Sequence, residues 1–192
     1  MKKELGAGTV AFPTPVYIVG TYGEDGTPNA MNAAWGGVCS SEPPCVMIAI
    51  RKERHTYDNI MRRKAFTVNF PDAAHVKEAD YFGLISGKKG NKFEAVDLTT
   101  EKSQYVDAPV IEEFPLALEC KCIDSLVVGQ HVMLVGEIVN VLADDNCVTE
   151  KGIVDIKKVD PLTYDPAANQ YNRIGETVAK AFSAGIEFLP KK

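Results

Sequence analysis

Short apolar runs separated by turn residues are the main pattern in the first third of the chain. Apolar and β-branched residues fill 16–22, 45–50 and 66–70, and each run is too short for a buried helix. Residues 23–28, Gly-Glu-Asp-Gly-Thr-Pro, have the composition of a turn that closes a hairpin. The pattern predicts strands at the three runs, with 45–50 buried on both faces.

The second half continues the β pattern. Residues 131–142 form a long, nearly continuous apolar run, and 153–159 is expected to form a further strand. Between 116 and 123 the chain alternates, which predicts an apolar face with Leu116, Leu118, Cys120 and Cys122 and a polar face with Glu119 and Lys121.

Three segments have helical patterns. A helix is expected over 56–64, with the Thr56 hydroxyl capping its first turn, because a threonine at that place can accept from an unpaired backbone N–H. Residues 72–85 place apolar side chains at helical spacing, and a last helix is expected over 175–183.

These elements favour one fold class, mainly β with a few helices. Short strands without a repeated strand–helix unit indicate a closed antiparallel β-barrel and not a doubly wound sheet. The chain has 192 residues, 45% of them hydrophobic, and contains no linker rich in serine, glycine or proline. We therefore expect a single domain over 1–192.

Charge and cysteine content narrow the function classes. A net charge of −5 argues against a nucleic acid partner, because phosphate backbones favour an excess of Lys and Arg. The apolar stretches are shorter than the roughly 20 residues that cross a bilayer, and residues 1–9 lack the apolar core of a signal peptide. The five cysteines form no regular framework. We expect a cytoplasmic protein with free thiols and no membrane partner.

Two familiar motifs are excluded. Residues 6–11 match the dinucleotide pattern G-x-G-x-x-A, but no strand precedes them, so an N-terminal loop is expected. Cys120 and Cys122 share a strand face without a second cysteine pair, so small buried side chains are a better interpretation than a metal site.

Basic residues gather where the helix at 56–64 begins. Arg51, Arg54 and His55 precede Thr56, and a helix start adds backbone N–H groups and a favourable dipole for an anion. The glycine-rich segment 87–93 adds Lys88, Lys89 and Lys92 as mobile charges that could fold over a ligand. Together they suit the phosphate of flavin mononucleotide (FMN). Alternatively, Thr56 only caps the helix and His55 is a solvated side chain.

Small and amide residues precede this basic cluster. They permit close approach of a flat ring, and their backbone N–H groups can meet flavin acceptors: Asn29, Ala30, Met31, Asn32, Ala33 and Trp35. Trp35 is the only tryptophan, and core packing is the alternative to ring contact. Cys39, Ser40 and Ser41 are candidates for contact with the ribityl chain. No catalytic acid or base stands out. A flavin enzyme need not have one, because the cofactor carries the chemistry.

The order of these motifs resembles that of a known family. Asn-Ala-Met-Asn-Ala-Ala-Trp, Ser-Ser-x-Pro-Pro, Arg-x-x-Arg-x-Thr and Phe-x-Val-Asn follow one another as in the flavin reductase-like family, and the chain is most similar to its flavoredoxin-like members. The resemblance implies an FMN-binding split β-barrel and a homodimer with FMN at the subunit interface.

The same resemblance implies roles for single residues. It places Asn29 and Trp35 near the isoalloxazine ring, Thr56 at the phosphate and Lys92 beside the flavin, while His131 and Tyr164 line the pocket. Family members use NAD(P)H or pass electrons to and from a redox protein, so the sequence leaves the electron donor and acceptor open.

Three functions from different classes remain at this point. The first is an FMN-dependent oxidoreductase or electron carrier, which the basic phosphate cluster favours. The second is a non-catalytic flavin- or haem-binding split-barrel module, with His131 as a haem ligand. The third is a structural barrel that binds a protein partner. For the dimer contact, the apolar strand at 132–142 and the region 164–188 are the candidates.

Overall fold

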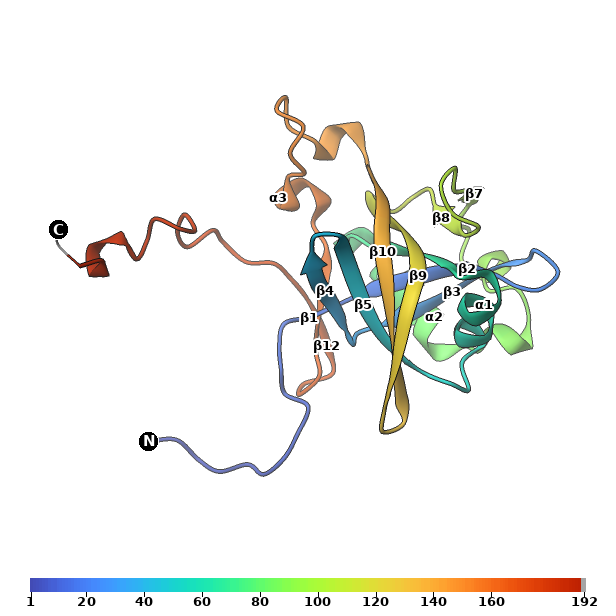
Figure 1. Ribbon diagram of the computed structural model, residues 1–192, viewed down its shortest axis with the longest axis horizontal. Coiled ribbons are helices and arrows are strands. Elements are labelled where there is room, and N and C mark those ends of the chain that lie inside the picture. The colour runs from blue at the N-terminus through green and yellow to red at the C-terminus, as the bar shows by residue number, and fades with distance from the viewer. Residues whose placement is uncertain (191–192) are drawn as a thin grey trace.

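A curved antiparallel sheet forms the body of the protein. The computed structural model describes residues 1–190 and is shown in Figure 1. Seven strands pair in the order β3-β2-β6-β9-β10-β5-β4. Their bounds are β2 Tyr17–Tyr22, β3 Pro28–Ala33, β4 Gly36–Ser41, β5 Pro44–Arg51, β6 Ala65–Phe70, β9 Leu116–Val128 and β10 His131–Ala143. The end strands β3 and β4 do not pair with each other among the described residues, so the barrel is split.

Smaller elements surround this barrel. Two further sheets join β1 (Thr14–Pro15), β11 (Leu162–Asp165) and β12 (Gln170–Arg173), and β7 (Thr100–Lys102) with β8 (Pro109–Ile111). The α-helices are α1 His55–Arg63, α2 Val76–Leu84 and α3 Ile156–Val159. Single 3₁₀ turns are η1 Ala73–His75, η2 Gly87–Lys89, η3 Phe93–Ala95, η4 Asp145–Cys147 and η5 Ile186–Phe188.

Two apolar clusters hold these elements together. The barrel interior is filled by fully buried side chains such as Ile48, Phe66 and Leu134. A second cluster lies beneath α2 and includes Ile18 and Phe82. Each fully buried side chain of this size contributes roughly 1.5–3 kcal/mol, so α2 is held in place on the outside of the barrel.

Most of the predicted elements are confirmed. The strands at 16–22, 45–50, 66–70 and 131–142 correspond to β2, β5, β6 and β10, and residues 23–28 close the β2–β3 hairpin. The helix expected over 72–85 is present as η1 followed by α2. All five cysteines are free, and Cys120 is buried.

Two predicted elements near the C-terminus are wrong. In the segment 153–159, Val154 makes only an isolated bridge with Val148, and the chain then turns into α3 because Asp155 caps it by accepting from the backbone N–H of Lys157. The helix expected over 175–183 is absent, and this segment runs extended and exposed before a short turn. Its apolar spacing is helical, but it packs against nothing in this chain that would stabilise a helix.

The polar face predicted for β9 is also partly wrong. Glu119 is 1% exposed, and one of its carboxylate oxygens accepts from Asn140 Nδ2 on the neighbouring strand at 2.5 Å. The strand twists so that both of its faces are covered at this point, and the amide of Asn140 makes burial of a carboxylate acceptable.

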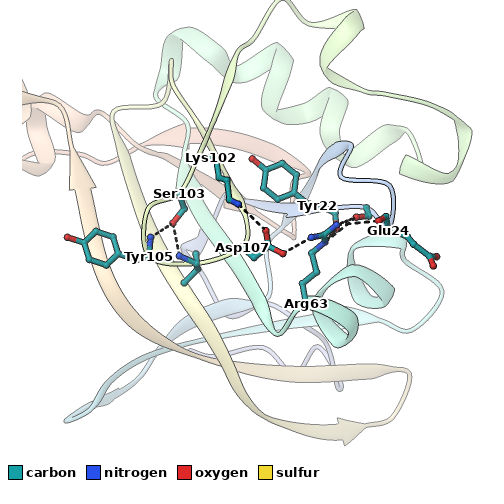
Figure 2. Close-up of polar contacts among 9 residues, drawn as sticks. Tyr22, Glu24, Arg63, Lys102, Ser103, Tyr105 and Asp107 are labelled. Atoms are coloured by element: carbon teal, nitrogen blue, oxygen red, sulfur yellow. Dashed lines mark hydrogen bonds and ion pairs between the residues drawn. The ribbon is translucent and has the colours of Figure 1, made fainter.

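Arg63, at the end of α1, is enclosed by backbone carbonyls. Its Nε donates to the carbonyls of Tyr22 and Gly23 at 3.2 and 3.1 Å, and Nη1 pairs with Asp107 at 2.5 Å. Figure 2 shows this group, in which Lys102 also approaches Asp107. The contact fastens α1 to the β2–β3 turn and to the loop between β7 and β8.

Two arms extend beyond the barrel, residues 1–13 and 174–190. Both leave on the same side of the molecule, at the left of Figure 1. Among the residues that the structure describes, no helix has both the length and the apolar character needed to span a membrane.

Candidate functional site

A half-open cavity of about 270 Å³ lies where five segments converge. These segments are the end of β3 with its connection to β4, the end of β5, the start of α1, the end of α2 with the loop after it, and the start of β10. Nine of the predicted site residues line it: Met31, Asn32, Ala33, Trp35, Arg51, His55, Thr56, Lys92 and His131.

Strand register explains why distant positions meet here. In the β5–β10 pair, Arg51 lies opposite His131, although 80 positions separate them in the chain. The helix α1 begins four residues after Arg51, so its first turn faces the same end of the barrel. A charged and a titratable side chain are thereby brought to the mouth of one cavity.

The start of α1 presents positive charge to this cavity. Arg54 is the N-cap residue and makes no capping hydrogen bond with its side chain. The prediction that Thr56 caps the helix is therefore wrong, because Thr56 is the second residue of the helix, two positions after Arg54. The first backbone N–H groups of a helix have no partner within it, and they add to the positive end of the helix dipole.

The two arginines at this end make no ion pair. Within residues 1–190, no carboxylate lies within 4.0 Å of the side-chain nitrogens of Arg51, Arg54 or His55. Asp58, in the first turn of α1, pairs instead with Lys88 at 3.5 Å. Positive side chains beside the N-terminal end of a helix interact unfavourably with the positive end of its dipole. Such an arrangement favours binding of an anion.

A buried polar network lies behind the helix start. Asn29 Nδ2 donates to Thr56 Oγ1 at 3.0 Å, and Asn59 Nδ2 donates to Thr21 Oγ1 at 3.1 Å. The Thr56 hydroxyl keeps its own O–H donor, since it accepts from Asn29. Asn29 Oδ1 is buried without a partner. The network fixes the rotamer of Thr56, and Asn29 is thereby a positioning residue.

Gly87 packs against this network. A Cβ at position 87 would clash with Asn29 Oδ1 and lie 3.0 Å from His55 Cδ2. A side chain there would displace the residues that orient Thr56, so the glycine permits the loop after α2 to close on α1.

Lys92 is fixed, contrary to the expectation that it belongs to a mobile loop. It is 3% exposed, and its Nζ donates to the carbonyls of Ala30 at 2.7 Å and Phe82 at 3.0 Å. Burial, and to a lesser extent the charge of Arg54, lower the pKa of Lys92 to about 8. An ammonium has three donors, so one remains beyond these two carbonyls for a ligand.

The other predicted site residues lie outside the cavity of a single chain. Asn29 and Ala30 stand behind it and act through Thr56 and Lys92. Lys89 is exposed on η2. The Tyr164 hydroxyl donates to Asn169 at 2.7 Å, and its ring packs on Tyr171.

Cys39, Ser40 and Ser41 lie at the far end of the β4–β5 pair. Ser40 is opposite Cys45, whereas the first residue of β5 that lines the cavity is Ala49. Four residues at about 3.3 Å each separate these two places by roughly 13 Å. Cys39, Ser40 and Ser41 therefore do not line the cavity of their own copy.

Sequence reasoning missed the contribution of residues 82–86, at the end of α2 and directly after it. Phe82, Gly83, Ile85 and Ser86 complete the cavity wall together with Gly87, which belongs to the segment expected to fold over a ligand. Their side chains have no pattern that distinguishes them from a surface helix end; only the glycine at 87 hinted at a close approach. No group of three or more His, Cys, Asp or Glu side chains that could hold a metal occurs among the described residues.

The donor set fits a flavin nucleotide. Two guanidinium groups, a hydroxyl and a helix start match a phosphate dianion, and the adjoining small residues leave space for a flat ring. The cavity volume is slightly below the lower limit of about 300 Å³ for ligand pockets. One chain therefore supplies the phosphate end more completely than the ring end.

Comparisons with known proteins agree with this geometry. A family model described as flavin reductase like domain matches residues 9–173. The solved flavoredoxin of Desulfovibrio vulgaris (Miyazaki F) is 46% identical, with a TM-score of 0.93 over 96% of this chain and 100% of that one. Flavoredoxin from Methanosarcina acetivorans is 28% identical, with a TM-score of 0.89 over 98% and 100%.

A relative from Archaeoglobus fulgidus is 33% identical over 134 residues, which are 70% of this chain and 75% of the relative. The family match spans most of the chain, and the structural matches reproduce the split barrel. This chain belongs to the flavin reductase-like family, with the fold of the flavoredoxins.

Proposed function

We propose that the protein is an FMN-dependent redox protein of the flavoredoxin type, with one FMN-binding domain over 1–192. The observation that carries this proposal is that Arg51 and Arg54, at the positive end of α1 and beside a half-open cavity, make no ion pair among the described residues. A neutral or cationic ligand would leave these charges uncompensated, whereas a phosphate dianion would neutralise them.

In this proposal the phosphate lies at the first turn of α1. Arg51 and Arg54 supply charge, His55 lines the same end, and the Thr56 hydroxyl donates to a phosphate oxygen. Asn29 holds that hydroxyl in place by its hydrogen bond of 3.0 Å.

The flavin ring lies against residues 31–35. Small side chains such as Ala33 let the backbone approach the ring edge, Trp35 borders it, and the free donor of Lys92 faces it. His131 completes the cavity on the β10 side. When bound, FMN supplies the electron transfer, and these residues bind and orient it.

The ring end calls for a second wall, and we propose that a second copy provides it in a homodimer. Four of the expected site residues lie outside the single-chain cavity: Cys39, Ser40, Ser41 and Tyr164. In a two-fold dimer these residues would contact the flavin that the other copy holds. A cavity of about 270 Å³ that is open to solvent supports this arrangement.

Mixing FMN-loaded protein anaerobically with NADH or NADPH identifies the electron donor. Bleaching of the flavin absorbance at catalytic rates indicates a reductase. A flavin that stays oxidised with both nucleotides but is reduced by a redox protein indicates a carrier.

The phosphate placement is tested with Thr56→Ala and Thr56→Ser. We expect Thr56→Ala to weaken FMN binding about tenfold and riboflavin binding much less, because only FMN has the phosphate. Thr56→Ser keeps the hydroxyl and should retain most of the affinity. Calorimetry with both ligands measures this, and equal losses for FMN and riboflavin would contradict the placement.

A further inference from the structure

The C-terminal arm exposes large apolar side chains, and it is joined to the body of the chain by a hydrogen bond from Lys157 Nζ to the carbonyl of Gly175 at 2.9 Å. Val178 and Phe182 are fully exposed, and Phe188 is 82% exposed. The arm runs away from the barrel without regular structure apart from one short turn. Holding an extended segment in one course costs conformational entropy, and only burial of its apolar side chains can offset that cost. The arm therefore requires a surface outside its own chain.

An apolar groove of about 440 Å³ lies on the side of the barrel from which the arms extend. It is formed by the end of the N-terminal arm, with Phe12, Pro13 and Pro15, and by Trp35 between β3 and β4. None of its lining residues is ionisable. Ala34 and Trp35 also line the candidate flavin cavity, so the groove and that cavity are neighbours that share a wall.

A second copy of this chain is the occupant that the observations favour. Each copy carries both an unpartnered apolar arm and an unfilled apolar groove, so a two-fold pair satisfies both at once. The match to the flavoredoxin of Desulfovibrio vulgaris covers 96% of this chain. Each arm holds more residues than the 4% of the chain that the match leaves out, so the match extends into both arms. Most arm residues thus have a counterpart in a solved protein.

We propose that the C-terminal arm of each copy, residues 174–190, seats in the groove beside Trp35 of the other copy. The arm then becomes part of the wall around Trp35, at the ring end of the cavity where one chain leaves an opening. This inference rests on the proposed function for the identity of the cavity, but the contact between arm and groove stands on the exposed side chains alone.

The test compares two exposed aromatic residues in the full-length protein. Phe182→Ser removes an apolar anchor from the arm, whereas Tyr105→Ser is the matched control, because Tyr105 is an exposed aromatic in the loop between β7 and β8, on the side away from the arms. Sedimentation velocity over a concentration series should show that Phe182→Ser weakens the dimer at least about tenfold. Tyr105→Ser should match the unmodified protein.

Trp35 supplies a second readout, because it is the only tryptophan. Phe182→Ser should shift its emission to longer wavelength and increase quenching by acrylamide, as the groove opens to water. Phe12→Ser, on the groove side, should weaken the dimer in the same way. A monomeric unmodified protein, or a dimer and a Trp35 signal unchanged by both substitutions, would overturn the inference.

The same samples separate this inference from the proposed function. Stronger binding of FMN than of riboflavin reports the phosphate site at α1, whatever the oligomeric state. If that preference persists while the arm substitutions have no effect, only the arm contact fails. If the arm substitutions dissociate the dimer while FMN is not preferred, only the FMN site fails.

Discussion

The two ends of α1 are both basic, but their surroundings differ. At the C-terminal end, Arg63 meets the carbonyls of Tyr22 and Gly23 and the carboxylate of Asp107, and Arg62 pairs with Glu24 at 3.2 Å. At the N-terminal end, Arg54 has no acid within 4.0 Å among the described residues. Figure 2 shows the first end with its partners in place.

The helix dipole makes this contrast informative. Cations at the C-terminal end of a helix are favourable, and those at the N-terminal end are unfavourable. Arg63 is therefore stabilised both by the helix dipole and by its hydrogen-bond partners, and its role is structural. The charges at the other end cost stability in the free protein, and an anion is what would offset that cost. Basic clusters of similar composition thus have a structural role at one end and, in the function that we propose, a binding role at the other.

Replacing Arg63 with methionine should give the largest effect. The substitution leaves the carbonyls of Tyr22 and Gly23 and the carboxylate of Asp107 without their donor, in a partly buried place. We expect a loss of about 2–4 kcal/mol in the free energy of unfolding. Urea denaturation measures it, and the preference for FMN over riboflavin should persist in the folded fraction. A neutral effect on stability would show that the two ends do not differ in role.

Arg54→Gln should give the opposite result. The free energy of unfolding should be unchanged or slightly raised, because a cation leaves the positive end of the helix. FMN affinity should fall about 10- to 30-fold, as for the loss of a charge-assisted hydrogen bond. Lys52→Gln is the matched control, since Lys52 is exposed nearby and does not line the cavity. Equal losses of affinity in the two variants would indicate diffuse attraction and no defined contact.

The pH dependence should give the smallest effect. Because the pKa of Lys92 is lowered to about 8, its charge is lost as pH rises from 7 to 9, and FMN affinity should fall by up to about tenfold. Over pH 8–10.5 the unfolded chain binds more protons at this lysine than the folded chain, so the unfolding free energy should rise with pH.

Titrations of FMN at several pH values check this expectation. Lys92→Met should remove the fall in affinity, whereas Lys77→Met, at an exposed position on α2, should retain it. A profile unchanged by Lys92→Met would assign the pH dependence to another group.

Particular elements show how far local pattern could lead. The β2–β3 hairpin was predictable because 23–28 is a turn sequence between two strands, and α2 because residues 72–85 place apolar side chains at helical spacing. The segment 175–183 has a similar spacing but forms no helix, because helical spacing needs a surface to pack on. Glu119 is buried because Asn140 from a neighbouring strand meets its carboxylate, which no local pattern encodes.

The sequence by itself determined the strands, the fold class and the basic cluster at 51–56, because these depend on residue spacing and on neighbours within a few positions. Only the tertiary structure decided which residues share the cavity. Register placed Arg51 beside His131, the end of α2 completed the wall, and burial between two carbonyls fixed Lys92. These outcomes depend on contacts between segments far apart in the chain, where the energy of packing exceeds any local preference.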